Sequence, residues 1–167
     1  MKRIGFILLI LCIAMTAFGQ KEKIQSSYIY NFTSYISWPE SEKTGDFVIG
    51  VLGNGPIQNE LNNLAATKKV ITQPIVVKNF SSARDIEKCH ILIITEGKSS
   101  QLQEALSKVS GNSTLVITES PGLASKGSGI NFVMKDGKML FELNKNKIEK
   151  NGLKINSKLT ALAVLVD

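Results

Sequence analysis

The chain is poor in the residue types that carry most catalysis and metal binding. Among its 167 residues there are one histidine, two cysteines and one tryptophan. Neither a G-x-S-x-G nor an S-x-x-K motif occurs, which excludes the usual serine nucleophiles of hydrolases. The sequence also lacks the clusters of histidine, cysteine and carboxylate that hold metal ions. These absences predict a protein that is not an enzyme and that carries no cofactor and no metal.

Long apolar runs are also scarce, and the one at the N-terminus is shorter than the roughly 20 residues of a membrane span. Two basic residues precede the uncharged run over 4–15, and Ala17–Gly19 supplies the small-x-small pattern of a cleavage site. The pattern predicts an export signal over 1–19, cleaved near Gly19, and a single mature domain over 20–167. A retained membrane anchor is the alternative. Export excludes functions that need ATP, an NAD pool or nucleic acid.

The mature chain is predicted to have no internal disulfide, because Cys12 leaves with the signal and only one cysteine remains. That residue, Cys89, opens an apolar run and is predicted to be buried and inert, with pairing between chains as the alternative. A catalytic pair of Cys89 with His90 is excluded, because neighbouring strand residues point to opposite faces of a sheet.

The charge balance is basic. The formal net charge is +6, and removal of Lys2 and Arg3 with the signal lowers it to +4. After Ser120 there are eight lysines against four acidic residues. Such a surface favours an acidic partner or an anionic membrane, although a merely solvated lysine-rich surface is the simpler interpretation. The lysines are dispersed without interleaved aromatics, which argues against nucleic acid as a partner.

Hydrophobic periodicity predicts the order of the elements. A first helix is expected over 21–37, with Ile24, Tyr28 and Phe32 on its apolar face and Asn31 in the middle of that face. Asp136-Gly137 between two apolar runs is a strong hairpin signal. The other expected elements are strands over 46–52, 74–80, 90–95, 114–118, 130–134 and 139–143, and helical segments over 56–66, 83–88, 99–109 and 155–166.

Alternating strands and helices indicate an α/β fold, with helices on both faces of a largely parallel sheet. We expect a three-layer sandwich with a mixed, mostly parallel sheet of five or six strands, a β-hairpin in the C-terminal half and a docked C-terminal helix. Gly50, Gly53 and Gly55 lie between a strand and a helix, but their spacing reverses the dinucleotide fingerprint. A tight turn is therefore expected there, and not a nucleotide site.

Several spaced segments together resemble one family, that of the YfiR-like periplasmic proteins. The resemblance covers nearly the whole mature chain and depends on the order of its segments. They are Tyr30–Phe32 with Tyr35 and Trp38-Pro39, Phe47–Gly53, Cys89–Leu92, Gly122–Ala124, Gly129–Val133, Phe141–Asn144 and Gly152–Leu159.

The resemblance implies a periplasmic regulatory binding protein. Its partner would be an inner-membrane signalling protein, either a diguanylate cyclase or a sensor histidine kinase, bound through its periplasmic portion. Release of a cyclase would raise cyclic-di-GMP and promote biofilm, and homodimers are also implied. Two features depart from the family, some of whose members use disulfides: a mature chain with Cys89 as its one cysteine cannot form an internal disulfide, and a loop often written with paired glycines reads Gly127-Ser128-Gly129.

Four residues near the first helix end and the glycine-rich loop are candidates for partner or ligand binding: Asn31, Trp38, Ser128 and Asn131. The alternative for each is structural, with Trp38 in the core, the two asparagines tying loops and Ser128 shaping a turn. The alternative function is a periplasmic small-molecule binding module without a membrane partner, which predicts an apolar pocket with a few convergent polar groups.

Overall fold

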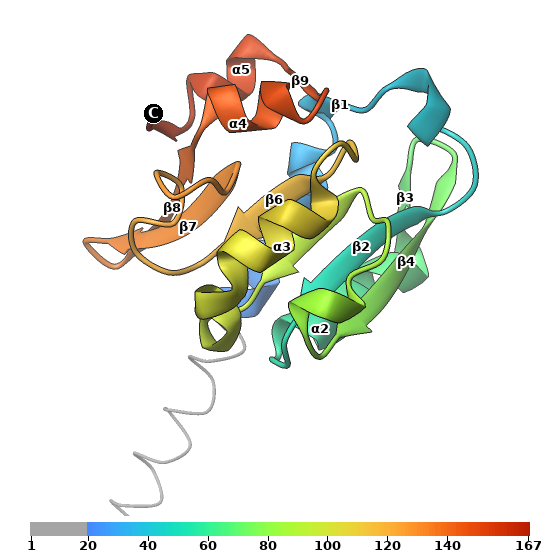
Figure 1. The fold of residues 1–167 in the computed structure, drawn as a ribbon, viewed down its shortest axis with the longest axis horizontal. Coiled ribbons are helices and arrows are strands. Elements are labelled where there is room, and N and C mark those ends of the chain that lie inside the picture. The colour runs from blue at the N-terminus through green and yellow to red at the C-terminus, as the bar shows by residue number, and fades with distance from the viewer. Residues whose placement is uncertain (1–19) are drawn as a thin grey trace, which may run out of the picture.

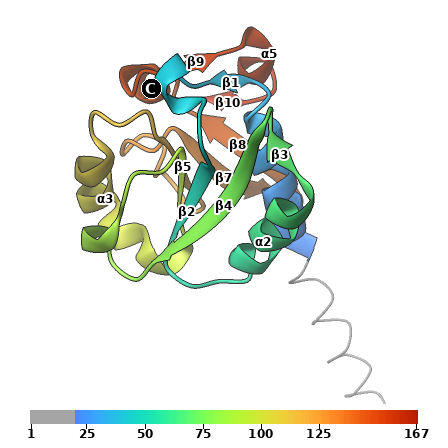
Figure 2. The ribbon, with the colours of Figure 1, turned by 90° about the vertical axis from the view of Figure 1, so that its right-hand side faces the viewer.

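The structure, a computed structural model, describes residues 20–167, so the predicted export signal lies outside the described residues. Three layers are visible in Figures 1 and 2. The first helix, over 20–32, and α2 (Ile57–Thr67) cover one face of a central sheet, and α3 (Leu102–Val109) covers the other. Within this part of the chain, no helix has the length and apolar character needed to cross a membrane.

The sheet has eight strands in the order β10-β8-β7-β6-β5-β2-β4-β3. It is mostly parallel, and only the β7–β8 and β3–β4 pairs are antiparallel. This confirms the predicted α/β class; six longer strands match the prediction, and the two-residue strands β3 and β10 extend the sheet at its edges. The strands are β2 (Phe47–Leu52), β3 (Lys69–Val70), β4 (Gln73–Phe80), β5 (Ile91–Ile94), β6 (Leu115–Thr118), β7 (Ile130–Lys135), β8 (Lys138–Leu143) and β10 (Val164–Leu165).

Each face of the sheet carries its own apolar core, because successive strand residues point to opposite faces. In β5, Ile91 and Ile93 pack with the first helix and α2, whereas Leu92 and Ile94 pack with α3. All four residues are buried. The uninterrupted apolar run of this strand, typical of central parallel strands, is therefore explained by burial on both faces.

The predicted hairpin lies between β7 and β8. Its two turn residues, Asp136 and Gly137, both have positive φ angles, of 51° and 72°. Two consecutive positive φ angles are the requirement of the type I′ turn, for which Asp-Gly is a preferred sequence. The hairpin was predictable because the turn residues alone specify this local geometry.

The first helix differs from its prediction in length and in orientation. It ends at Phe32, and Ile36–Ser37 forms β1, which pairs with β9 (Lys154–Ile155) in a separate two-stranded sheet. The buried face of the helix runs through Gln25, Ile29 and Phe32, so Asn31 is exposed and does not lie within the apolar face. The pairing with β9 draws Ile36 into an extended conformation, which ends the helix early.

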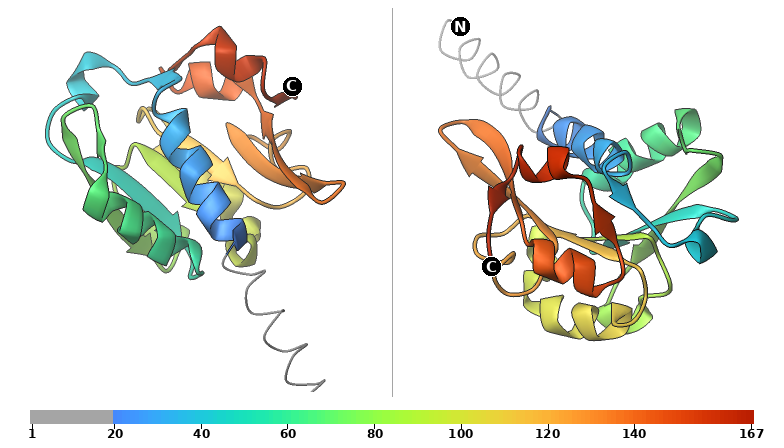
Figure 3. Two further views of the ribbon diagram at one scale, coloured as in Figure 1. Left: turned by 180° about the vertical axis from the view of Figure 1, so that it is seen from behind. Right: turned by 90° about the horizontal axis from the view of Figure 1, so that it is seen from above.

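The closing segment contains a much shorter helix than predicted. After α4 (Lys145–Lys150), the helix α5 covers only Ser157–Thr160 and docks through the buried Leu159. The chain then extends as β10, which pairs in parallel with β8, and Leu162 is exposed. The short segments η1 (Glu40–Glu42), η2 (Ala83–Asp85) and η3 (Glu96–Gln101) complete the fold, and Figure 3 shows α4 and α5 together at one end of the molecule.

Burial makes Cys89 a protected thiol. Loss of contact with water raises the pKa of this residue to about 12, so only about one thiol in ten thousand is ionised at pH 8. About a tenth of the thiols are ionised at pH 8 in the unfolded protein, so we expect Ellman's reagent to react with the native protein about 1000-fold more slowly than with the unfolded protein, as measured by absorbance. A native rate equal to the unfolded rate would contradict the burial of this thiol.

The same shift predicts how stability depends on pH. The folded state holds the thiol proton more tightly than the unfolded state, whose ordinary pKa for Cys89 is 9.0. The stabilisation is thus fully present below pH 9 and is lost as the pH rises toward 12. Urea unfolding of the protein and of Cys89→Ala at pH 8 and pH 10.5 measures this difference. The fall in stability between the two pH values should be larger for the parent.

Candidate functional site

Two of the four predicted site residues lie together in the interior. Ser128 and Asn131 are fully buried and share a contact, the Thr118 hydroxyl at the end of β6. Thr118 donates to Asn131 Oδ1 at 2.7 Å and lies 2.9 Å from the Ser128 hydroxyl. Asn131 in turn donates from Nδ2 to Glu142 Oε2 at 2.8 Å. These contacts support the structural alternative for both residues, since neither side chain presents surface to a partner.

The other two predicted residues lie apart from this network and from each other. Trp38 is 7% exposed, packs edge-on against Phe47 with ring centroids 5.0 Å apart, and donates its indole N–H to the His90 carbonyl at 3.3 Å. Asn31 is exposed beside Leu162, at a shallow hollow near the C-terminal segment. The four residues therefore do not form one site.

The single histidine has a structural role. The Val48 N–H donates to His90 Nδ1 at 3.0 Å, so the ring proton lies on Nε2, which donates to the Glu42 carbonyl at 3.0 Å. The ring is also stacked on Phe47, with centroids 4.5 Å apart. Both ring nitrogens are thus used in holding η1 against the sheet, and neither is free for proton transfer.

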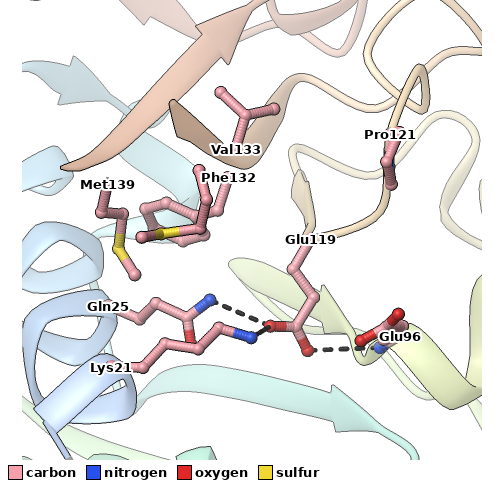
Figure 4. A pocket seen from close by; sticks show the side chains of 9 residues that line it. Lys21, Gln25, Glu96, Glu119, Pro121, Phe132, Val133 and Met139 are labelled. Atoms are coloured by element: carbon pink, nitrogen blue, oxygen red, sulfur yellow. Dashed lines mark hydrogen bonds and ion pairs between the residues drawn. The ribbon is translucent and has the colours of Figure 1, made fainter. Parts of the chain in front are cut away.

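A cavity of about 440 Å³ opens at the carboxyl ends of the parallel strands (Figure 4). Its polar wall comes from the first helix and from the segments that follow β5 and β6. Its apolar wall comes from Pro121 and from the β7–β8 hairpin. We call it the carboxyl-edge cavity, lined by Lys21, Gln25, Glu96, Glu119, Pro121, Phe132, Val133, Met134 and Met139.

Glu119 is the centre of the polar wall. Its Oε2 accepts hydrogen bonds from Lys21 Nζ at 2.9 Å and from Gln25 Nε2 at 3.0 Å. Its Oε1 accepts the backbone N–H of Glu96 at 3.2 Å. Both oxygens of this carboxylate are satisfied, and the contacts link the first helix to the ends of β5 and β6 (Figure 4).

A smaller cavity of about 140 Å³ adjoins the first and shares Gln25, Glu96 and Glu119 with it. It extends under the first helix to the turn between β2 and α2, where Gly53 has a φ of 104°. Its inner wall includes Glu22, which is 8% exposed. Among the buried side-chain oxygens and nitrogens of residues 20–167, Glu22 Oε2 alone has no hydrogen-bond partner.

A second hollow, of about 280 Å³, lies at the β3–β4 turn. We call it the Ile71 groove, formed chiefly by Tyr30, Trp38, Lys43, Lys69 and Ile71. Ile71 is 80% exposed and has a φ of 57°, in the left-handed region. The Tyr30 hydroxyl donates to the Lys69 carbonyl at 3.1 Å, which holds the turn against the first helix.

The groups in these hollows do not resemble a metal centre. Within residues 20–167, no three or more histidine, cysteine, aspartate or glutamate side chains converge closely enough to hold a metal ion. The carboxylates at the carboxyl edge are thus spread along a wall.

The comparison with protein families gives a match over most of the chain. The profile of the YfiR/HmsC-like family matches residues 22–164. The chain belongs to this family. The YfiR/HmsC-like family is a regulatory one, associated with the periplasm and with cyclic-di-GMP signalling, so membership agrees with the resemblance in the sequence. A comparison with curated proteins finds no match.

Sequence reasoning found Trp38 of the Ile71 groove but missed Ile71 itself and the residues of the two cavities at the carboxyl edge of this YfiR/HmsC-like chain. Glu22, Gln25 and Ser26 are spaced in register with Ile29 and Phe32, so a helical wheel anchored on the latter pair shows that the polar residues share the buried face. That signal was present in the sequence.

Ile71 gave no such signal. It lies between Val70 and Thr72 without glycine or asparagine, the residues that usually indicate a positive φ in a turn.

Proposed function

We propose that the protein is a periplasmic regulator that binds the sensor portion of an inner-membrane diguanylate cyclase and restrains it. The family match supports the regulatory class and the cyclic-di-GMP context. The export signal predicted over 1–19 supports the compartment. The observation that carries the docking surface is the exposed, left-handed Ile71 at the rim of its groove.

The conformation of Ile71 is unfavourable in the isolated protein. A β-branched residue in the left-handed region is strained by about 1–2 kcal/mol, and hairpin turns normally place glycine there. Core packing does not offset this strain, because most of the side chain is in water. An apolar side chain held at such an angle on the surface is the kind of feature that a contact with a partner explains.

The surroundings of Ile71 specify the chemistry of that partner. Lys43 and Lys69 line the groove, and Lys68 lies over the Tyr30 ring at 5.9 Å from its centroid. No acidic side chain is among the described residues that line it. An acidic segment with an apolar side chain that packs beside Ile71 and Trp38 fits this groove best. Trp38 therefore stays a proposed contact residue.

Binding restrains the partner by selecting one of its conformations. A regulator that binds the inactive form of a membrane protein more tightly shifts its equilibrium toward that form. Such an action needs no catalytic group. A homodimer, which the resemblance implies, is compatible with this mechanism but is not required by it.

Ile71→Asn is the sharpest test, because it separates folding from binding. Asparagine tolerates the left-handed region, so we expect the free energy of unfolding to rise by about 1 kcal/mol. Affinity for the periplasmic portion of the partner cyclase should fall about tenfold or more, as measured by calorimetry. Leu162→Asn, which also replaces an exposed leucine-sized side chain but lies away from the groove, should leave the affinity unchanged.

In cells, the same variant should release the cyclase. We expect Ile71→Asn to raise cyclic-di-GMP to the level of a strain without the protein, whereas Leu162→Asn keeps the parental level. Unchanged cyclic-di-GMP in both the deletion and the variant would contradict a cyclase partner. A change in the phosphorylation of a response regulator in its place would indicate the sensor histidine kinase.

A further inference from the structure

We propose that the carboxyl edge of the sheet binds a small organic cation, specifically a primary amine attached to an apolar body. The site consists of the two adjoining cavities, with Glu22 receiving the ammonium group and the carboxyl-edge cavity receiving the body. This inference does not rest on the proposed partner. It rests on an unpartnered buried carboxylate oxygen, on the charges around it and on the apolar wall beside it.

Glu22 is a buried carboxylate with one unpartnered oxygen. The first helix directs this residue inward with Gln25 and Ser26, and Oε2 is enclosed without a hydrogen-bond donor. A buried charged acceptor that lacks a donor is strongly unfavourable. Glu119, less buried, has donors on both of its oxygens. The molecule therefore satisfies one carboxylate at this edge and leaves the more enclosed one without a partner.

The charged groups around the two cavities determine the sign of the charge that a ligand can carry. Three glutamates and one lysine line the two cavities: Glu22, Glu96, Glu119 and Lys21. The N-terminus of α2 also faces the smaller cavity and by itself favours an anion. An anion there would approach the unpartnered carboxylate, whereas an ammonium group supplies the donors that the carboxylate lacks. The lack of a hydrogen-bond donor for the buried carboxylate therefore favours a cation over an anion.

The walls of the carboxyl-edge cavity indicate the nature of the rest of the ligand. The carboxyl-edge cavity has an apolar wall of Pro121, Phe132 and Met139, opposite its polar wall (Figure 4). Its volume of about 440 Å³ lies within the ordinary size range of small-molecule sites. The two cavities share the side chains of Gln25, Glu96 and Glu119, so we place the ammonium group of the ligand in the smaller cavity and its apolar body in the larger one. The combination selects an amine with an aromatic or aliphatic body over a fully hydrated cation.

The experiment uses 2-phenylethylamine as the probe, with two ligands of the same body as controls. These are 2-phenylethanol, which is neutral, and 3-phenylpropionate, which is an anion. Calorimetry with the purified protein at pH 7 should give about tenfold tighter binding of the amine than of either control. Equal or tighter binding of the alcohol or the acid would overturn the proposal.

Variants assign the two parts of the site. Glu22→Gln should weaken the amine about tenfold and leave the alcohol unchanged, whereas Met139→Ala should weaken both ligands by a similar factor. Glu149→Gln, the same change on the exposed face of α4, should alter neither. Unchanged amine affinity in Glu22→Gln would overturn the assignment.

The melting temperature of Glu22→Gln gives a readout that needs no ligand. Removal of an unpartnered buried charge should leave this temperature unchanged or higher. A fall of several degrees would show instead that the carboxylate stabilises the helix, and would overturn the proposal. Affinity of the same variant for the cyclase fragment is measured separately, so failure of this proposal and failure of the proposed function are distinguishable.

Discussion

Asn131→Asp is expected to lower the free energy of unfolding by about 4 kcal/mol at pH 7. The change replaces the amide N–H₂ that donates to Glu142 Oε2 with a second carboxylate oxygen, at a separation of 2.8 Å in the parent. Position 131 is fully buried and Glu142 is half-buried, so water screens the repulsion only in part. Urea unfolding followed by circular dichroism measures the loss.

The pH dependence identifies the cause of that loss. The neighbouring negative charge and burial raise the pKa of the introduced carboxyl in the folded state. The deficit is therefore full at neutral pH and shrinks as the pH falls, because a protonated carboxyl donates where the amide did. Asn131→Ala should lose about 2 kcal/mol without this dependence. Asn59→Asp, an exposed change in the first turn of α2, should stay within about 0.5 kcal/mol of the parent.

The central strands could be predicted from the sequence because burial on both faces leaves a distinctive run of apolar residues. β2, β4 and β6 begin and end within one residue of their predicted bounds. The hairpin at Asp136-Gly137 could also be predicted from a local signal, because its two turn residues determine it. In each of these places the local preference of the chain and the requirement of the fold agree.

The predictions failed where long-range pairing overrides local periodicity. The spacing of apolar residues over 155–166 is that of a helix. Nevertheless, Ile155 pairs with Ile36, and Val164 pairs with Glu142, both far away in the sequence. Helical periodicity is a weak guide when a strand partner lies more than 20 residues away.

The candidate site was predictable only in part, and for a related reason. Trp38 was chosen from its place at the helix end, and it does line the Ile71 groove. Ser128 and Asn131 were chosen from a glycine-rich loop, but Ser128 is buried in the turn after β6 and Asn131 is buried within β7. Glu22 was missed because polar residues near a helix start usually face solvent. Tertiary packing, not local sequence, decides which of these side chains a ligand reaches.

Trp38→Ala is expected to lower the free energy of unfolding by about 4 kcal/mol. The indole is nearly enclosed, lies edge-on against Phe47 and donates to the His90 carbonyl. Truncation leaves a large cavity and removes one of the two hydrogen bonds to the His90 carbonyl, which still accepts the Leu115 N–H at 2.9 Å. Because domains of this size are stable by only about 5–15 kcal/mol, the variant should unfold at a markedly lower urea concentration. A loss below about 1 kcal/mol would contradict the packing of this ring.

Trp38→Phe separates the packing of this residue from its place in the Ile71 groove. A phenyl ring keeps the contact with Phe47 and loses the indole N–H, so the free energy of unfolding should fall by about 1.5 kcal/mol. The groove wall stays aromatic, and affinity for the cyclase fragment should remain within about threefold of the parent. If this folded variant instead loses as much affinity as Ile71→Asn, the partner contacts the indole group itself.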